Sequence, residues 1–210
     1  MGFGLLFVGY FFANMMPPGD SMLSLAKLIG YPLMIAAFYR LAPYHKRFLY
    51  CFFASFATLP FAIYHGMIGL FKLGVLSEYW FLTGSFHTVA EILYLAVSLV
   101  LHVMMLLAIA GLAGELKHTA IRTHAWRNFT FVAAYFLLRF VMMMPIRTLQ
   151  RLFAPTLLLW LCMVILNLFL LFKCYRYICP EGDENMPEPI KLPLDTDEGA
   201  ERHGEDDDGE

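Results

Sequence analysis

The chain has 210 residues, of which 60% are hydrophobic and only 15% are charged, and its formal net charge is −2. A water-soluble domain has about 45–50% apolar and about 25% charged residues, so the composition excludes that class. The charges are also segregated, because 13 of the 17 acidic residues lie in Glu181–Glu210 and only Asp20, Glu78, Glu91 and Glu115 precede them. An apolar body with an excess of bases predicts an integral membrane protein.

Six apolar runs predict transmembrane helices, each of which needs about 20 residues to cross the hydrocarbon. Lipid admits helices because they satisfy their own backbone hydrogen bonds. We therefore expect an all-α, polytopic transmembrane bundle of six helices over residues 1–179. The predicted helices are Met1–Met16, Met22–Leu41, Arg47–Phe71, Trp80–Leu112, Asn128–Pro145 and Pro155–Tyr175.

Internal prolines interrupt two of these runs, Pro32 after Gly30-Tyr31 in the second and Pro60 in the third. Proline removes a backbone hydrogen bond and kinks a helix. Broken helices near mid-membrane occur at transporter binding sites, but single prolines are also common in membrane helices without such a role. Both interpretations stay open at this point.

Residues 180–210 predict a disordered, acidic, cytoplasmic tail. This segment has no aromatic residue and several prolines, and it ends in the acidic run Glu205–Glu210. It cannot bury enough apolar surface to offset the entropy of ordering. The tail is interpreted as a solubilising segment, with docking to a basic cytoplasmic protein as the alternative.

Lysine and arginine in the short loops predict the orientation. With the N-terminus inside, eight bases lie at the inner surface and three at the outer surface. The inner bases are Arg40, Lys46, Arg47, Lys117, Arg122, Arg127, Lys173 and Arg176, and the outer ones are Lys72, Arg147 and Arg151. The count predicts a protein of the plasma membrane with both termini in the cytoplasm.

The segment Glu115–Asn128 is expected to be a basic loop at the inner surface. Its bases fit a positive-inside anchor, and binding of anionic lipid head groups is the alternative. We expect no nucleic-acid partner, because the only free segment of the chain is acidic.

The fourth predicted helix carries a polar stripe. At 100° per residue, one narrow face holds His87, Glu91, Tyr94, Ser98 and His102. A charged group in mid-membrane costs about 2.5–3.5 kcal/mol on insertion scales, so this face should not contact lipid. We expect it to face other helices or a water-filled cavity.

Ionisable side chains of four helices fall at similar depth in the outer half of the membrane. They predict an intramembrane polar cluster in which Glu91 pairs with Arg139, or with Lys27 as second choice. Arg139 is favoured because helices adjacent in sequence are usually neighbours in space. The full cluster is Lys27, His65, His87, Glu91 and Arg139.

Two interpretations of this cluster stay open. In the structural one, the charges neutralise each other and add interhelical contacts worth about 0.6 kcal/mol each on average. In the functional one, the cluster is a solute or proton site open to the outside, since ionisable residues inside a membrane mark substrate and ion pathways. The excess of bases over acids suits a small anion.

The leading prediction is therefore a small-solute or ion transporter of permease-like type. The alternative is a non-catalytic membrane partner or sensor whose acidic tail binds a cytoplasmic protein. An enzyme is less favoured because no phosphate loop or hydrolase motif occurs, and we expect no cofactor. His87 and Glu91 have the i, i+4 spacing of a helical metal pair, but no third ligand lies nearby, so no metal site is predicted.

Overall fold

The computed structural model describes residues 2–14, 25–75, 84–143 and 152–178, which form six α-helices, one 3-10 turn and no strand. The all-helical fold class is thereby confirmed. The acidic tail lies outside the described residues. The helices are α1 (Gly2–Asn14), α2 (Leu25–Leu41), α3 (Arg47–Lys72), α4 (Ser85–Glu115), α5 (Thr119–Met142) and α6 (Phe153–Ile178), with η1 at Ala42–Tyr44.

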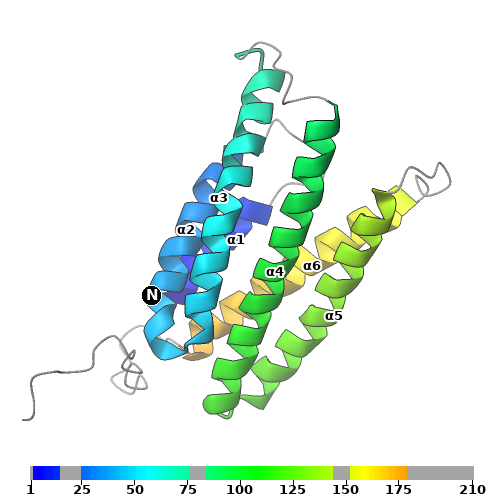
Figure 1. Ribbon diagram of the computed structural model, residues 1–210. Coiled ribbons are helices and arrows are strands. Elements are labelled where there is room, and N and C mark those ends of the chain that lie inside the picture. The colour runs from blue at the N-terminus through cyan, green and yellow to red at the C-terminus, as the bar shows by residue number, and fades with distance from the viewer. Residues whose placement is uncertain (1, 15–24, 76–83, 144–151, 179–210) are drawn as a thin grey trace, which may run out of the picture.

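The helices pack as a closed ring in which each contacts the next in sequence and α6 returns to α1. Figure 1 shows α2, α3, α4 and α5 in front, with α1 and α6 behind them. Two short turns, residues 42–46 and 116–118, join helices at one end of the bundle, which we call the short-turn end. The end at which α3 finishes and α4 begins is called the long-connection end.

Membrane association follows from the length and composition of the helices. Two of the six differ from the rest. α1 has 13 residues, about 20 Å at 1.5 Å per residue, whereas the hydrocarbon is about 30 Å thick. α5 has 24 residues but contains Arg122, Arg127 and Arg139. The segments long and apolar enough to cross a membrane are Leu25–Tyr44, Arg47–Lys72, Ser85–Glu115 and Phe153–Ile178.

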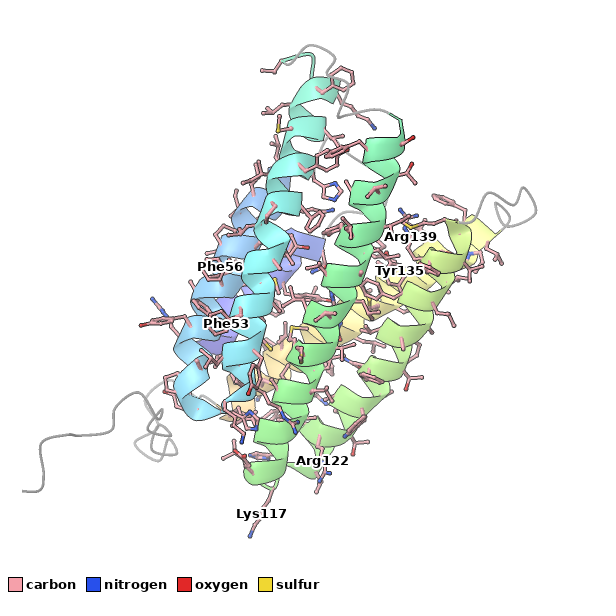
Figure 2. All side chains as sticks on the ribbon, viewed as in Figure 1. Phe53, Phe56, Lys117, Arg122, Tyr135 and Arg139 are labelled. Atoms are coloured by element: carbon pink, nitrogen blue, oxygen red, sulfur yellow. The ribbon has the colours of Figure 1, made fainter. Side chains whose placement is uncertain are left out.

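Large apolar side chains cover the outside of the bundle. Phe53 and Phe56 on α3 are 61% and 47% exposed, and Leu137 on α5 is 67% exposed. Figure 2 labels the two phenylalanines on α3. Water-soluble monomers rarely expose apolar patches of this extent, so the surface fits contact with lipid chains.

Neither internal proline breaks its helix. α2 runs without interruption through Pro32, and α3 runs through Pro60. The interruption predicted at Gly30 is instead a close contact between helices, since a Cβ at Gly30 would lie 2.4 Å from the backbone nitrogen of Ala13. Small residues allow helix backbones to approach in membranes, so Gly30 serves packing of α1 on α2.

The fifth helix begins nine residues before the predicted start, so the expected loop Glu115–Asn128 is wrong. α4 continues to Glu115, only residues 116–118 form the connection, and α5 starts at Thr119. The early turns of α5 therefore carry Arg122 and Arg127, and Lys117 lies in the connection. A hydropathy pattern misses this part of a helix, because a polar sequence outside the hydrocarbon can still satisfy helix propensity.

Candidate functional site

Polar side chains from α2, α3 and α4 meet at the long-connection end of the bundle. Tyr94 on α4 lies at the centre of this group. Its hydroxyl is 3.0 Å from the Tyr31 hydroxyl on α2, and the Lys27 Nζ lies 4.6 Å from the centre of its ring. The His65 ring of α3 packs edge-on against Tyr94 at 4.6 Å between centroids. Lys27, Tyr31, His65 and Tyr94 thus surround one spot between three helices.

The carboxylate of Glu91 faces His65 on α3. Its Oε1 lies 3.6 Å from the His65 Nδ1, and Glu91 is half-buried. The predicted pair with Arg139 is not formed, because among the described residues no ion pair joins Arg139 to a carboxylate. Arg139 instead lies one turn beyond Tyr135, whose ring is within electrostatic range of both Arg139 and Glu91.

The failed pairing has a geometric reason. α4 and α5 are neighbours, as their adjacency in sequence predicts. Adjacency does not fix the rotation of a helix about its own axis, however, and α4 turns Glu91 toward α3. The second choice, Lys27, interacts with the face of Tyr94, and a cation over an aromatic ring gains about 0.5–2 kcal/mol.

His87, the first residue of the polar stripe on α4, contacts a tyrosine that the sequence analysis did not single out. Its Nδ1 lies 3.0 Å from the Tyr64 hydroxyl on α3. Phe86 packs edge-on against the same tyrosine at 6.0 Å. His87 therefore extends the polar group toward the beginning of α4, by one turn beyond Glu91.

The other end of the stripe, Ser98 and His102, is buried in the middle of the bundle. The His102 Nδ1 donates to the Ser98 carbonyl at 2.7 Å, so the neutral ring carries its proton on Nδ1. The rings of Tyr10 and Phe136 lie 5.6 and 5.5 Å from the His102 ring. Within the described part of the chain, no group hydrogen-bonds the His102 Nε2, although this atom is buried.

Two asparagines that the sequence analysis did not assign to the site complete the buried polar groups. The Asn167 Nδ2 on α6 donates to the Tyr10 hydroxyl at 2.9 Å. The Asn128 Nδ2 on α5 donates to the Asn167 Oδ1 at 3.1 Å and to the Leu166 carbonyl at 2.8 Å. Asn167 could have been noticed from sequence, because an amide inside an apolar run needs an interhelical partner.

The arrangement offers a cation, tyrosine hydroxyls, imidazoles and one carboxylate inside an apolar bundle. These groups can bind a small polar or charged molecule by hydrogen bonds and ion pairing. Over the residues described, no group of three or more His, Cys, Asp or Glu side chains could hold a metal ion. The group around Tyr94 is thus a candidate binding site for such a molecule.

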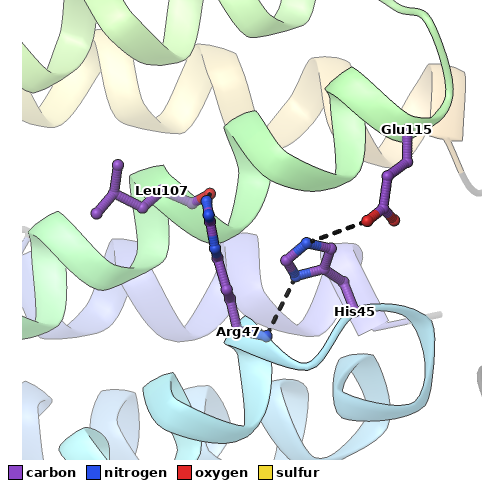
Figure 3. A network of polar contacts seen from close by, with 4 residues as sticks. All are labelled: His45, Arg47, Leu107 and Glu115. Carbon is purple, nitrogen blue, oxygen red and sulfur yellow. Dashed lines mark hydrogen bonds and ion pairs between the residues drawn. The ribbon is translucent and has the colours of Figure 1, made fainter.

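A second polar network, which we call the His45 network, lies at the short-turn end, where residues 42–46 join α2 to α3. It consists of His45, Arg47, Leu107 and Glu115. The Arg47 backbone N–H, at the start of α3, donates to the His45 Nδ1 at 3.1 Å, so Nδ1 carries no proton. The His45 Nε2 lies 3.5 Å from the Glu115 Oε1, and the Arg47 Nη1 donates to the Leu107 carbonyl at 3.1 Å. Figure 3 shows these contacts spanning from the turn to α4.

The His45 network depends on one face of α4. Leu107, Gly111 and Glu115 are spaced by four residues and so share that face. A Cβ at Gly111 would lie 2.9 Å from the His45 Nε2, so glycine leaves the space that the imidazole occupies. Burial lowers the pKa of His45 from its usual value, with Glu115 acting in the opposite direction and Arg47 and Lys46 acting in the same direction.

We expect acid to lower the folding stability that the His45 network contributes. The folded-state pKa of His45 lies below the unfolded value of about 6.5. The contribution of His45 to the free energy of unfolding is therefore present above that pH and is lost as the pH falls below it. Removing Glu115 lowers the pKa of His45 further, so Glu115→Gln should deepen the loss of stability as the pH falls below about 6.5. Thermal unfolding across this range measures the effect, with His45→Gln as the control that removes it. A shallower loss in Glu115→Gln would contradict the assignment.

The bases assigned to the predicted loop cover the same end of the bundle. Lys117 and Arg122 lie at the bottom of Figure 2, near the turn between α4 and α5. On the neighbouring helices, the Lys173 Nζ of α6 lies 3.0 Å from the His124 Nε2 of α5. The basic surface at this end is thus built from α5 and α6 together.

Comparison with known proteins gives no relative. No protein-family model matches the chain, and no curated protein or solved structure is significantly similar to it. The proposals below therefore stand on the residues and their geometry.

Proposed function

We propose that this protein transports a small solute or ion across a membrane, in the manner of a permease, and that the polar group around Tyr94 binds that solute. The observation that carries the proposal is the Glu91 carboxylate facing His65, with Lys27 beside it on Tyr94. Such groups inside a bundle are expensive to insert and mark substrate and ion pathways. The alternative role, interhelical contact alone, would pair the charges, but among the described residues no ion pair joins Glu91 to Lys27.

The charge of this group favours a small anion. The predicted cluster contains two bases, Lys27 and Arg139, but one carboxylate, Glu91, which faces His65, and the hydroxyls of Tyr31 and Tyr94 can donate hydrogen bonds. In the described ranges, no carboxylate lies within ion-pair distance of either base. An anion between the helices would supply the missing negative charge.

The proposal includes the topology. All six helices cross the plasma membrane, and both termini lie in the cytoplasm, so the long-connection end faces outside. The excess of bases at the short-turn end supports this orientation. Single cysteines placed at Gly74 and His118 test it with a membrane-impermeant maleimide. We expect labelling of Gly74→Cys from outside and of His118→Cys only after the membrane is opened, and the reverse pattern would invert the topology.

A second candidate function is a non-catalytic membrane partner or sensor, in which the acidic tail docks on a basic cytoplasmic protein. The concentration of 13 acidic residues after residue 180 favours it. The basic surface around Lys173 and His124 supports a further partner, the head groups of anionic lipids. These roles leave the group around Tyr94 without a part in function, which separates them from transport.

Substitution at the polar group tests the leading proposal. Purified protein is heated with acetate, benzoate, phosphate, chloride or tetramethylammonium. A ligand at a hundred times its Kd stabilises the folded state by about 2.7 kcal/mol, which raises Tm by several degrees. We expect at least one anion to raise Tm and Lys27→Gln to abolish that rise. Glu91→Gln removes a negative charge from the same group, so it should strengthen anion binding and enlarge the rise in Tm.

Two control variants match these changes at other places in the fold. Glu115→Gln removes the carboxylate at the short-turn end, and Lys72→Gln removes an exposed lysine at the end of α3. Both should keep the anion effect, as should truncation after Ile178. Loss of the effect in the controls as well, or stabilisation by the cation alone, would overturn the proposal. Loss of the anion effect on Tm in the truncated chain alone would favour the tail-docking function.

A further inference from the structure

Buried polar side chains continue from the group around Tyr94 into the middle of the bundle. Tyr94 contacts the Tyr31 hydroxyl at 3.0 Å, and the side chain of Ser98 faces the same hydroxyl. One turn further along α4, the His102 Nδ1 lies 3.5 Å from the Ser98 Oγ. The exposed fraction of Tyr31, Ser98 and His102 is 5% or less, so these groups are enclosed by helices.

The same line goes on toward the short-turn end through other helices. The Tyr10 ring of α1 packs edge-on against His102, and its hydroxyl accepts from the Asn167 Nδ2 of α6. Asn167 in turn accepts from the Asn128 Nδ2 of α5. The Arg127 Nη2 lies 3.5 Å from the Asn128 Oδ1, and Arg127 is exposed. Side chains from α1, α2, α4, α5 and α6 thus form one line between the two ends, in which the step from His102 to Tyr10 is a ring contact.

Interhelical contact explains only part of this line. The amides of Asn128 and Asn167 and the hydroxyl of Tyr10 satisfy one another, as polar groups that hold membrane helices together do. The His102 Nε2 differs, because it is a buried acceptor for which the described residues provide no donor. A buried acceptor without a donor is destabilising, so this atom is available to a molecule that carries an N–H or O–H group.

We propose that this line is the route by which water and the solute cross the bundle, and that the His102 Nε2 accepts a hydrogen bond there from a water molecule or from an O–H or N–H of the solute. The inference rests on the proposed transport function. In the structure, the Tyr10 ring against His102 closes the route, and the Asn167 amide holds the Tyr10 hydroxyl in that position. Passage requires Tyr10 to leave this contact.

Cysteine accessibility tests the route without knowledge of the solute. The four native cysteines are replaced by serine, and single cysteines are introduced in the full-length chain at Ser98, His102 or Tyr94. A charged, water-soluble methanethiosulfonate then reports water access, because it reacts with the thiolate and a thiol in lipid stays protonated. Val100, on the same helix between Ser98 and His102, is 49% exposed on the outside of the bundle and is the matched control.

We expect Ser98→Cys and His102→Cys to react at least about ten-fold faster than Val100→Cys, because only a hydrated thiol ionises. Serine and cysteine are close in size, so Ser98→Cys decides the result even if His102→Cys fails to fold. Reaction of Ser98→Cys no faster than Val100→Cys would overturn the route. If Tyr94→Cys still reacts in that case, the binding site of the proposed function stands. If Tyr94→Cys is also inert, the proposed function fails with the route.

Discussion

Replacement of Gly30 by alanine is expected to separate α1 from α2 and to destabilise the protein by about 1–3 kcal/mol, or more if the helices cannot shift. The added Cβ would lie 2.4 Å from the Ala13 nitrogen and 2.8 Å from its Cα. Both are backbone atoms, so no side chain can rotate away. On the facing helix, a Cβ at Gly9 would in turn lie 2.8 Å from the Met34 nitrogen. Thermal unfolding in detergent measures the loss.

A second glycine supplies the control, because its replacement by alanine is expected to change Tm in the opposite direction or not at all. The nearest atom to a Cβ at Gly114, near the end of α4, is the Arg122 Cδ at 4.0 Å. Because alanine favours a helix over glycine by about 0.8–1.0 kcal/mol, Gly114→Ala should leave Tm unchanged or raise it. Equal Tm values for Gly30→Ala and the parent would show that the close approach of α1 and α2 does not limit stability.

Replacement of Asn167 by leucine is expected to have the next largest effect. Asn167 is 1% exposed and bonds both Tyr10 and Asn128, so it links α6 to α1 and α5. The substitution leaves the Tyr10 hydroxyl without this partner. A buried polar group left unsatisfied costs about 1–3 kcal/mol, although interhelical hydrogen bonds in membranes have averaged only about 0.6 kcal/mol. We expect a loss of about 1–2 kcal/mol in thermal or denaturant unfolding.

A double-mutant cycle isolates the interaction. Tyr10→Phe removes the hydroxyl that Asn167→Leu leaves without a partner, so the double variant should lose less than the sum of the two single variants. Asn128 keeps its hydrogen bond to the Leu166 carbonyl in either case. Strict additivity would mean that the contact between Tyr10 and Asn167 carries no energy of its own.

The two predictions bear on the proposed transport as well as on stability. Gly30 lies next to Tyr31, so the close contact of α1 with α2 also fixes the hydroxyl that meets Tyr94. Asn167 holds the Tyr10 ring near His102, where the proposed route is closed. Passage along the proposed route would break these contacts, so we expect the conformational change to lie among α1, α4 and α6.

The all-helical fold was predictable from local sequence because each apolar run carries its own signal. A helix satisfies its backbone within one segment, so length and hydropathy suffice to place most of its residues. The face of α4 that carries Ser98 and His102 follows from the 3.6-residue period alone, and both residues are buried. Hydropathy gave no signal for the start of α5 at Thr119, because that part of the helix is polar.

Which groups meet across helices was decided only by the tertiary structure. Glu91 faces His65 and not Arg139, and Tyr31 joins Tyr94, because each contact depends on the rotation and depth of two helices at once. Gly30, which resembled a helix break, is a contact point because a separate helix passes within backbone distance of it. The sequence by itself therefore determined most of each helix, apart from the start of α5, and the polar face of α4. Packing of side chains between helices determined the pairs, since such contacts are non-local and no periodic pattern encodes them.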